Sequence, residues 1–232
     1  SSYQSSKSIL VGVFWMFLSG LCFVAVIGLV RYLGDQLPAS VSAFIRYGIG
    51  LLFFLPYFVK WPRNRLNSTN FYRYMWRGIL HSMAVIFWFF AMSRLAIAEV
   101  TAIGYMTPVF TTIGAVLFFK ERISLWRIFV ILMAFAGVLI ILRPGFQDFT
   151  LGRAAQLCAT LFFAGSYLMA KNLTKTEDAG AIVAMMTLFV TISLDPIAFI
   201  FWVTPTFYTV FILAFVALFA TLAHFAMTKA IA

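Results

Sequence analysis

The chain has 232 residues, of which 63% are hydrophobic and only 10% are charged. Soluble domains carry about 45–50% apolar and about 25% charged residues, so this composition excludes a water-soluble globule and predicts a polytopic integral membrane protein. The net charge of +10 would suit a nucleic-acid-binding protein, but the lysines and arginines lie between apolar runs and form no basic motif. Membrane topology is therefore the better explanation of the charge, and no nucleic-acid partner is expected.

A helix needs about 20 apolar residues to cross a bilayer, and eight segments of that kind follow one another along the chain. Turn signals that contain Gly or Pro separate them, as at 34–38, 143–145 and 204–206. The pattern predicts an all-α bundle of membrane helices. The eight helices are expected at residues 9–33, 40–59, 78–95, 98–119, 124–142, 151–173, 180–203 and 207–230.

The distribution of basic residues predicts the orientation of this bundle. If the N-terminus is cytoplasmic, twelve lysines and arginines lie inside and four lie outside, and Arg46 falls within the second helix. Cytoplasmic loops of membrane proteins carry the excess of positive charge. The N-terminus is therefore expected on the cytoplasmic side of a plasma membrane, which for a bacterial protein is the inner membrane.

Two short patterns recur in the same order and indicate an internal repeat. Residues 90–94 (Phe-Ala-Met-Ser-Arg) recur as residues 225–229 (Phe-Ala-Met-Thr-Lys), and the first predicted helix resembles the sixth, for example at Phe23 and Phe163. Chance similarity between apolar helices is the alternative. Because five helices separate the copies, the two halves would have opposite orientation, as in many secondary transporters.

The repeat also predicts the domain organisation. Residues 1–145 would form a first repeat of five helices, and residues 146–232 a second repeat in which only three helices are present. Two helices equivalent to 98–119 and 124–142 are missing from the second repeat. We therefore expect ten helices in the full protein, of which this chain would be a fragment.

Most predicted helices carry a stripe of polar or aromatic side chains at helical spacing, which marks an interface or a wet cavity in lipid. A single Ser or Thr usually bonds a backbone carbonyl one turn earlier, but seven stripes together favour a shared central cavity. The fifth helix has no stripe, which suggests close packing or a dimer contact. Aromatic residues that could shape the cavity are Trp15, Trp88, Tyr105 and Tyr167.

Ionisable residues inside the spans cost free energy in lipid and therefore mark candidate functional positions. Arg46 and Asp195 lie at similar depth below the outer surface, so they could form a structural ion pair or hold two ends of a zwitterion; both alternatives stay open. Glu99 begins a helix, where it complements the helix dipole. His81 and His224 are placed near the cytoplasmic helix ends, as hydrogen-bonded residues or as groups that titrate near neutral pH.

Two further observations concern the chemistry of the chain. Glu121, between Lys120 and Arg122, fits either an inner gate or a solvated interface. The sequence contains no nucleophile motif, P-loop or cluster of Cys and His with metal-ligand spacing. We therefore expect no cofactor, no metal site and no catalytic residue.

Four motifs carry a resemblance to a known family. They are Ala-Phe-Ile-Arg-Tyr at 43–47, Tyr-Met-Thr-Pro at 105–108, Phe-Lys-Glu-Arg-Ile at 119–123 and Gly-Val-Leu-Ile at 137–140. Together they resemble the EamA-like group of the drug/metabolite transporter superfamily. The resemblance implies ten helices in two inverted repeats, alternating access and small-metabolite substrates. It marks Arg46, Pro108 and Glu121 as family positions and Gly137 as a packing site.

These observations favour a secondary transporter of amino acids or related polar and zwitterionic metabolites. Arg46 and Asp195 would bind charged substrate groups, while Glu121, His81, His224 and Pro108 are candidates for gating or for a coupling proton. An intramembrane lipid-modifying enzyme and a receptor or scaffold that does not transport are the alternatives. Besides the substrate, the expected partner is membrane lipid, and both a monomer and a homodimer are open.

Overall fold

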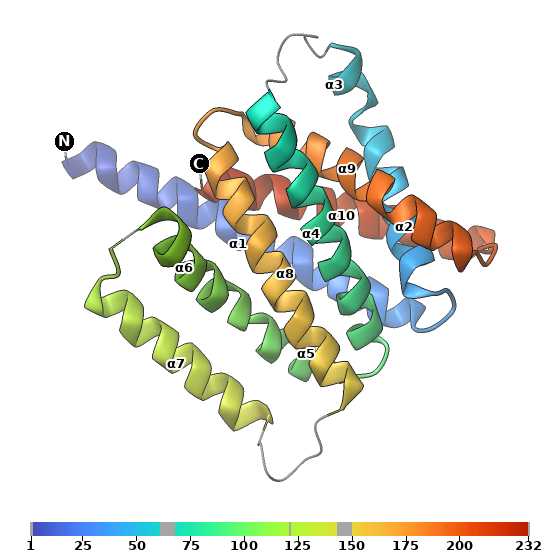
Figure 1. Ribbon diagram of the computed structural model, residues 1–232, viewed down its shortest axis with the longest axis horizontal. Coiled ribbons are helices and arrows are strands. Elements are labelled where there is room, and N and C mark those ends of the chain that lie inside the picture. The colour runs from blue at the N-terminus through green and yellow to red at the C-terminus, as the bar shows by residue number, and fades with distance from the viewer. Residues whose placement is uncertain (1, 61–67, 121, 143–149, 232) are drawn as a thin grey trace. The chain divides into compact units, whose positions relative to one another are not determined.

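The computed structural model describes residues 2–60, 68–120, 122–142 and 150–231, and over these ranges the chain forms helices and turns without any strand (Figure 1). Such an all-helical chain agrees with the predicted membrane bundle. In chain order the helices are α1 (Ser2–Leu33), α2 (Ala39–Phe53), α3 (Leu55–Val59), α4 (Ser68–Met92), α5 (Ile97–Gly104), α6 (Met106–Phe119), α7 (Leu125–Leu142), α8 (Leu151–Leu173), α9 (Ala179–Ile200) and α10 (Phe207–Ile231).

Two of the predicted spans are interrupted. The span expected at 40–59 breaks at Phe54, where α2 ends and α3 begins. The first turn of α3 contains a proline. Proline provides no amide hydrogen, so it interrupts the hydrogen bonds of a continuous helix but is tolerated at the start of a new one. The span expected at 98–119 breaks at Tyr105, between α5 and α6.

The third span begins ten residues earlier than the hydropathy predicts, at Ser68 instead of residue 78. The added turns contain polar and aromatic residues, which a search for continuous apolar runs assigns to a loop. Within them Tyr74 and Arg77 are fully buried. The earlier start also changes the position of His81, which lies near the middle of α4 and not near its end.

Five helical segments are long and apolar enough to cross a membrane within the described ranges, and α2 and α7 are shorter apolar helices. The five segments are Leu10–Leu33, Thr69–Met92, Ile97–Phe119, Ala179–Ile200 and Phe207–Ile231. The helix α8 has the predicted bounds but is not among these five. The chain is therefore a polytopic helical membrane protein.

Contacts divide the chain into two compact units. Unit 1 comprises residues Ser1–Ile79 and Met169–Ala232, and unit 2 comprises Leu80–Leu168. The boundary falls inside α4 and inside α8, so each unit contains part of both helices.

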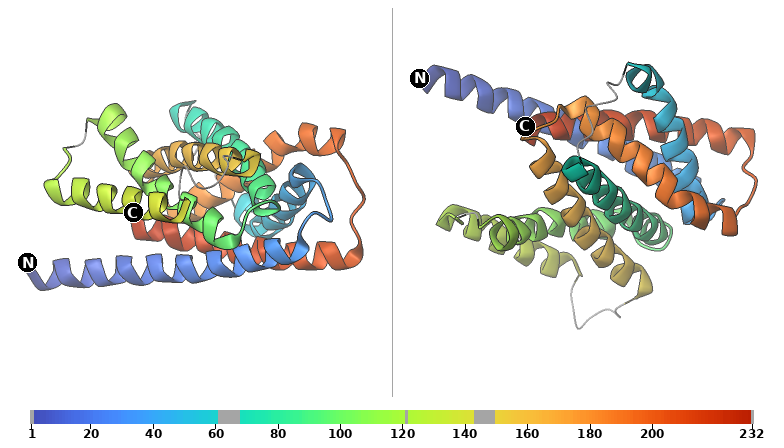
Figure 2. Two further views of the ribbon diagram at one scale, coloured as in Figure 1. Left: turned by 90° about the horizontal axis from the view of Figure 1, so that it is seen from below. Right: turned by 45° about the horizontal axis from the view of Figure 1, so that its top comes forward.

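In unit 1 the long helix α1 lies antiparallel beside α10 (Figure 2). Ser19 donates a hydrogen bond to the Ala223 carbonyl (2.9 Å), and the hydroxyl groups of Tyr32 and Tyr208 bond to each other at 2.9 Å. The helix α2 packs against α9 and α10. This arrangement brings α2, α9 and α10, which all carry polar side chains, together in one unit.

In unit 2 the described parts of α4 and α8 pack closely, with the rings of Phe87 and Phe162 stacked at 5.9 Å. The helix α7 packs on α5 and α6. Its contact with α6 is a small apolar core made of Met106, Val109 and Val138. Large apolar side chains on the rest of α7 are exposed, as expected for a helix surrounded by lipid.

Candidate functional site

A small cavity in unit 1 brings together polar side chains from three helices. Its volume is about 10 Å³ for the centre of a water-sized molecule, which is room for roughly one water. Helix α2 contributes Arg46, Tyr47 and Gly50, α9 contributes Val183, Met186 and Thr187, and α10 contributes Thr221 and His224.

The periodicity of the helices explains why these residues meet. Arg46 and Gly50 are four residues apart and therefore share one face of α2. A β-carbon on Gly50 would lie 3.5 Å from Thr187 Cγ2 and 3.5 Å from Thr221 Oγ1, so the missing side chain leaves space between the three helices. Thr187 donates its hydroxyl to the Val183 carbonyl at 2.8 Å, as is usual for Thr in a helix.

Arg46 is the principal charged group of this cavity. Its side chain is only 7% exposed, and its guanidinium carbon lies 3.7 Å from the centre of the Tyr47 ring. Among the residues that the structure describes, it makes no salt bridge with a carboxylate. A buried cation without a counter-ion is costly, so this cavity is suited to an anionic group from outside the chain.

A second buried arginine lies close to this cavity. Arg77 on α4 is 0% exposed and donates a hydrogen bond to the Ile182 carbonyl at 3.0 Å. Ile182 is followed directly by Val183, which lines the cavity. Positive potential is therefore concentrated in this part of unit 1.

Arg77 is not among the predicted site residues, because its place before the predicted third span put it among the cytoplasmic charges. Helical spacing was the signal that could have found it. Tyr74, Arg77 and His81 follow one another at intervals of three and four residues, which places them on one helix face. All three are fully buried.

His224 is the second predicted candidate that lies in the cavity. Its ring is buried and meets the Phe23 ring edge-on at 5.2 Å, with an angle of 89° between the planes. Trp15 lies elsewhere on α1, where its ring is 6.3 Å from that of Phe225. Trp15 therefore packs between α1 and α10 and does not line the cavity.

Asp195 does not pair with Arg46. It is exposed on α9, eight residues beyond Thr187, which is about 12 Å along a helix. The structural ion pair between Arg46 and Asp195, one of the two alternatives left open by their equal depth, is not formed. Equal depth in the bilayer could not reveal this, because depth says nothing about which face of a helix a residue occupies.

A separate polar cluster occurs in unit 2 around His81. His81 Nδ1 and Ser166 Oγ are 3.1 Å apart, and both residues are fully buried. The His81 ring meets Phe163 edge-on at 5.1 Å, and Phe163 stacks on Tyr167 at 6.0 Å. Trp88, also predicted as a cavity residue, is half-buried and meets Phe89 edge-on at 5.3 Å.

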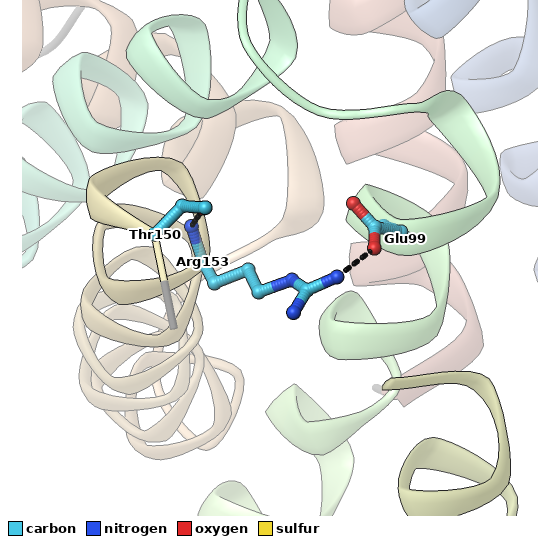
Figure 3. Close-up of polar contacts among 3 residues, drawn as sticks. All are labelled: Glu99, Thr150 and Arg153. Carbon is cyan, nitrogen blue, oxygen red and sulfur yellow. Dashed lines mark hydrogen bonds and ion pairs between the residues drawn. The ribbon is translucent and has the colours of Figure 1, made fainter. Parts of the chain in front are cut away.

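Glu99 forms an ion pair that the sequence did not predict. Its carboxylate oxygen Oε1 lies 2.5 Å from Arg153 Nη2, which ties the start of α5 to the start of α8 (Figure 3). The Arg153 amide also donates to Thr150 Oγ1 at 3.4 Å. Complementing the helix dipole is therefore not the only role of Glu99.

The remaining candidates lie outside both clusters. Tyr105 and Pro108 are exposed and line a groove between α5, α6 and α7. Glu121 falls outside the described residues. Among the residues that are described, no group of three or more His, Cys, Asp or Glu side chains could hold a metal ion.

Comparison with known proteins identifies the family. Residues 10–143 match the model of the EamA-like transporter family. The chain is 30% identical to a riboflavin transporter of Vibrio cholerae over 228 residues, which is 96% of this chain and 76% of the relative. It is 26% identical to an S-adenosylmethionine uptake transporter of Rickettsia bellii over 224 residues, 97% of this chain and 77% of that protein.

One solved crystal structure shares the fold, with a TM-score of 0.69 at 14% sequence identity; the match covers 97% of this chain and 79% of the other. The chain belongs to the EamA-like transporter family. Its named relatives are transporters of the drug/metabolite transporter superfamily. The protein is accordingly a membrane transporter and not an enzyme, which removes the lipid-modifying alternative.

Proposed function

We propose that this transporter moves a small organic metabolite that carries a negatively charged group, and that this group binds Arg46. The observation that carries the proposal is the burial of Arg46 beside a cavity, with no described carboxylate as its partner. A substrate anion would supply the missing counter-ion. The Thr221 hydroxyl and the Tyr47 phenol line the same cavity and can add hydrogen bonds.

The size of the cavity fits a mechanism of alternating access. Room for roughly one water is too little for a metabolite, so α2, α9 and α10 must separate before a substrate can enter. Secondary transporters commonly bind substrate near the bilayer midplane, between inverted repeats that rock around the site. We include this two-repeat mechanism in the proposal.

The named relatives support a substrate of metabolite size. S-adenosylmethionine contains an amino-acid group with one carboxylate and one ammonium, whereas riboflavin has no anionic group. The buried Arg46 therefore favours the amino-acid-like type. For a long zwitterion, Asp195 stays the candidate for the cationic end, at about 12 Å along α9 from Thr187.

The proposal includes a location and an energy source. We place the protein in a bacterial inner membrane with its N-terminus in the cytoplasm, following the distribution of basic residues. Asp195, His81 and His224 are the candidates for a coupling proton. His224 is the most direct of these because it shares the cavity with Arg46.

A matched ligand pair tests the role of Arg46. Thermal unfolding of the purified protein is measured with S-adenosylmethionine and with its decarboxylated analogue, which keeps the adenosine and the sulfonium, and the screen is extended to amino acids and their amides. A bound ligand raises the apparent stability by mass action. We expect ligands that carry the carboxylate to raise the unfolding temperature more than their partners that lack it.

Arg46→Gln should weaken the binding of such a ligand by at least about 30-fold, because truncating one side of a buried charge pair costs about 2–5 kcal/mol. Arg31→Gln, at the exposed end of α1, is the matched control and should bind normally. Uptake into proteoliposomes should show the same order. Equal stabilisation of the wild type and of Arg46→Gln by every carboxylate would refute the assignment.

A further inference from the structure

Unit 2 contains a groove that the proposed transport mechanism does not use. It lies between α7 and the α5–α6 span and has a volume of about 640 Å³, which is within the range of small-molecule sites. Its walls include Tyr105, Val109, Trp126, Ala134 and Gly137. Most of the side chains that line it are apolar.

The length of the groove corresponds to one leaflet of a bilayer. Along α7 its lining runs from Trp126 to Val138, a rise of twelve steps or about 18 Å of helix. Half of a bilayer's hydrocarbon core is about 15 Å thick. Small residues keep the inner part open, since a β-carbon on Gly137 would meet no atom within 4 Å.

Charge is confined to one end of the groove. Arg127 lines it there, and Lys120 and Arg122 are exposed in the turn between α6 and α7. Glu121 is the only acidic residue of the sequence between 106 and 142. Trp126, which is 71% exposed at the same end, is the type of side chain found where hydrocarbon meets headgroups.

From this geometry we propose that the groove binds one acyl chain of an anionic phospholipid. The chain would lie along α7 between Trp126 and Val138, and the phosphate would meet Arg127 with Lys120 and Arg122 nearby. Basic pockets between membrane helices suit anionic headgroups. This site is independent of Arg46 and of the proposed substrate.

Lipid binding can be measured directly by native mass spectrometry of the purified 232-residue chain, titrated with phosphatidylglycerol and, separately, with phosphatidylcholine of the same acyl chains. We expect one phosphatidylglycerol to bind in clear preference to phosphatidylcholine. Arg127→Gln should weaken the binding of phosphatidylglycerol about fivefold, since one basic residue near anionic lipid contributes about that factor. Phosphatidylcholine binding should change less.

Gly137→Leu should reduce the binding of both lipids, because its side chain fills the groove. Gly20→Leu is the matched control, since Gly20 is an exposed helical glycine of α1 at which an added β-carbon would meet no atom of another segment within 4 Å. Arg94→Gln, an exposed arginine in the α4–α5 turn, is the control for charge. Neither control should change lipid binding.

Three outcomes would overturn the proposal. The first is the absence of any preference for phosphatidylglycerol. The second is a preference that survives both Arg127→Gln and Gly137→Leu. The third is a change of oligomeric mass in Gly137→Leu without a change in lipid binding, because a second copy of the chain would then occupy the groove. If Gly137→Leu does not fold, Arg127→Gln alone decides.

Discussion

Arg46 and Arg77 are both buried in unit 1, and they differ in how the chain accommodates their charge. Arg77 reaches across from α4 and donates to the Ile182 carbonyl of α9 at 3.0 Å. Arg46 faces a cavity and lies over the ring of its own neighbour, Tyr47. The first arrangement holds two helices together, whereas the second leaves a guanidinium available to a ligand.

This difference predicts opposite effects on stability. Burying a charge without a counter-ion is costly, and even a buried ion pair can often be replaced by apolar side chains of similar volume with a gain of about 1–4 kcal/mol. Arg46→Met should therefore unfold at a higher temperature than the wild type when no ligand is present. Arg77→Met should unfold at a lower temperature, because it loses a charged hydrogen bond of about 1.5–3 kcal/mol.

Thermal unfolding in one detergent, followed by intrinsic fluorescence, gives both values. Arg31→Met provides the control for an exposed arginine. A lower unfolding temperature for Arg46→Met would mean that Arg46 is a structural residue, and its assignment to substrate would then lose its main support.

The sequence was sufficient to find Arg46, because an arginine stands out within an apolar span. It was not sufficient to predict that Asp195 would be exposed, since facing directions depend on which helices become neighbours. Arg77 and His81 were misplaced for a different reason. The polar first turns of α4 concealed its true start, and so both residues were assigned to the wrong depth.

At the level of helices, packing in both units depends on glycines that allow close approach. Gly78 of α4 lies against the backbone of Phe189 in α9, and an added β-carbon would overlap Phe189 directly. Gly114 of α6 instead faces the tip of the Leu168 side chain. A flexible leucine can move aside, whereas a helix backbone cannot.

Gly78→Ala should therefore be clearly destabilising, at the upper end of the 1–3 kcal/mol that is typical of overpacking. Gly114→Ala should cost less, and Gly28→Ala, in open space on α1, should be neutral or slightly stabilising because alanine favours helix. Unfolding temperatures of the three variants should follow this order. Equal values for Gly78→Ala and Gly28→Ala would contradict the contact with α9.

The ion pair between Glu99 and Arg153 can be tested by a double-mutant cycle. Both side chains are largely buried, at 20% and 9% exposure, so their coupling should exceed the 0–1 kcal/mol of surface pairs and reach about 1–3 kcal/mol. The cycle uses Glu99→Gln, Arg153→Gln and the double variant. Additive losses of stability would show that the two helix ends are not coupled.

The bounds of α7, α8 and α10 agree closely with the prediction, because long apolar runs with clear turn signals define both of their ends. The breaks at Phe54 and Tyr105 were not predicted. Each break is a local change of backbone conformation, and the mean hydropathy of a span carries no information about such a change.

For the molecule as a whole, the orientation in the membrane is open to a simple test. In a chain without Cys22 and Cys158, Asp35→Cys and Lys175→Cys introduce single thiols at exposed positions in the α1–α2 and α8–α9 turns. If the N-terminus is cytoplasmic, a membrane-impermeant maleimide added to intact cells should label position 35 but not position 175. The reverse pattern would place the N-terminus outside.

Composition and hydropathy alone were enough to establish a polytopic membrane protein, and four short motifs were enough to suggest its family. The internal repeat stays a prediction. The two compact units each combine segments from both proposed repeats, as interleaved packing allows, and a division by contacts therefore does not measure the similarity of two halves.

The interruption at Tyr105 has a mechanical consequence. The Tyr105 amide divides its hydrogen bonding between the carbonyls of Thr101 and Ala102, and Pro108, which has no amide hydrogen, leaves the Gly104 carbonyl without its usual donor. The backbone hydrogen-bond ladder is weakened here, so the α5–α6 span bends more easily at this point than along its regular turns. A pivot at that depth would let the part of the span on one side of the bilayer move while the part on the other side keeps its position.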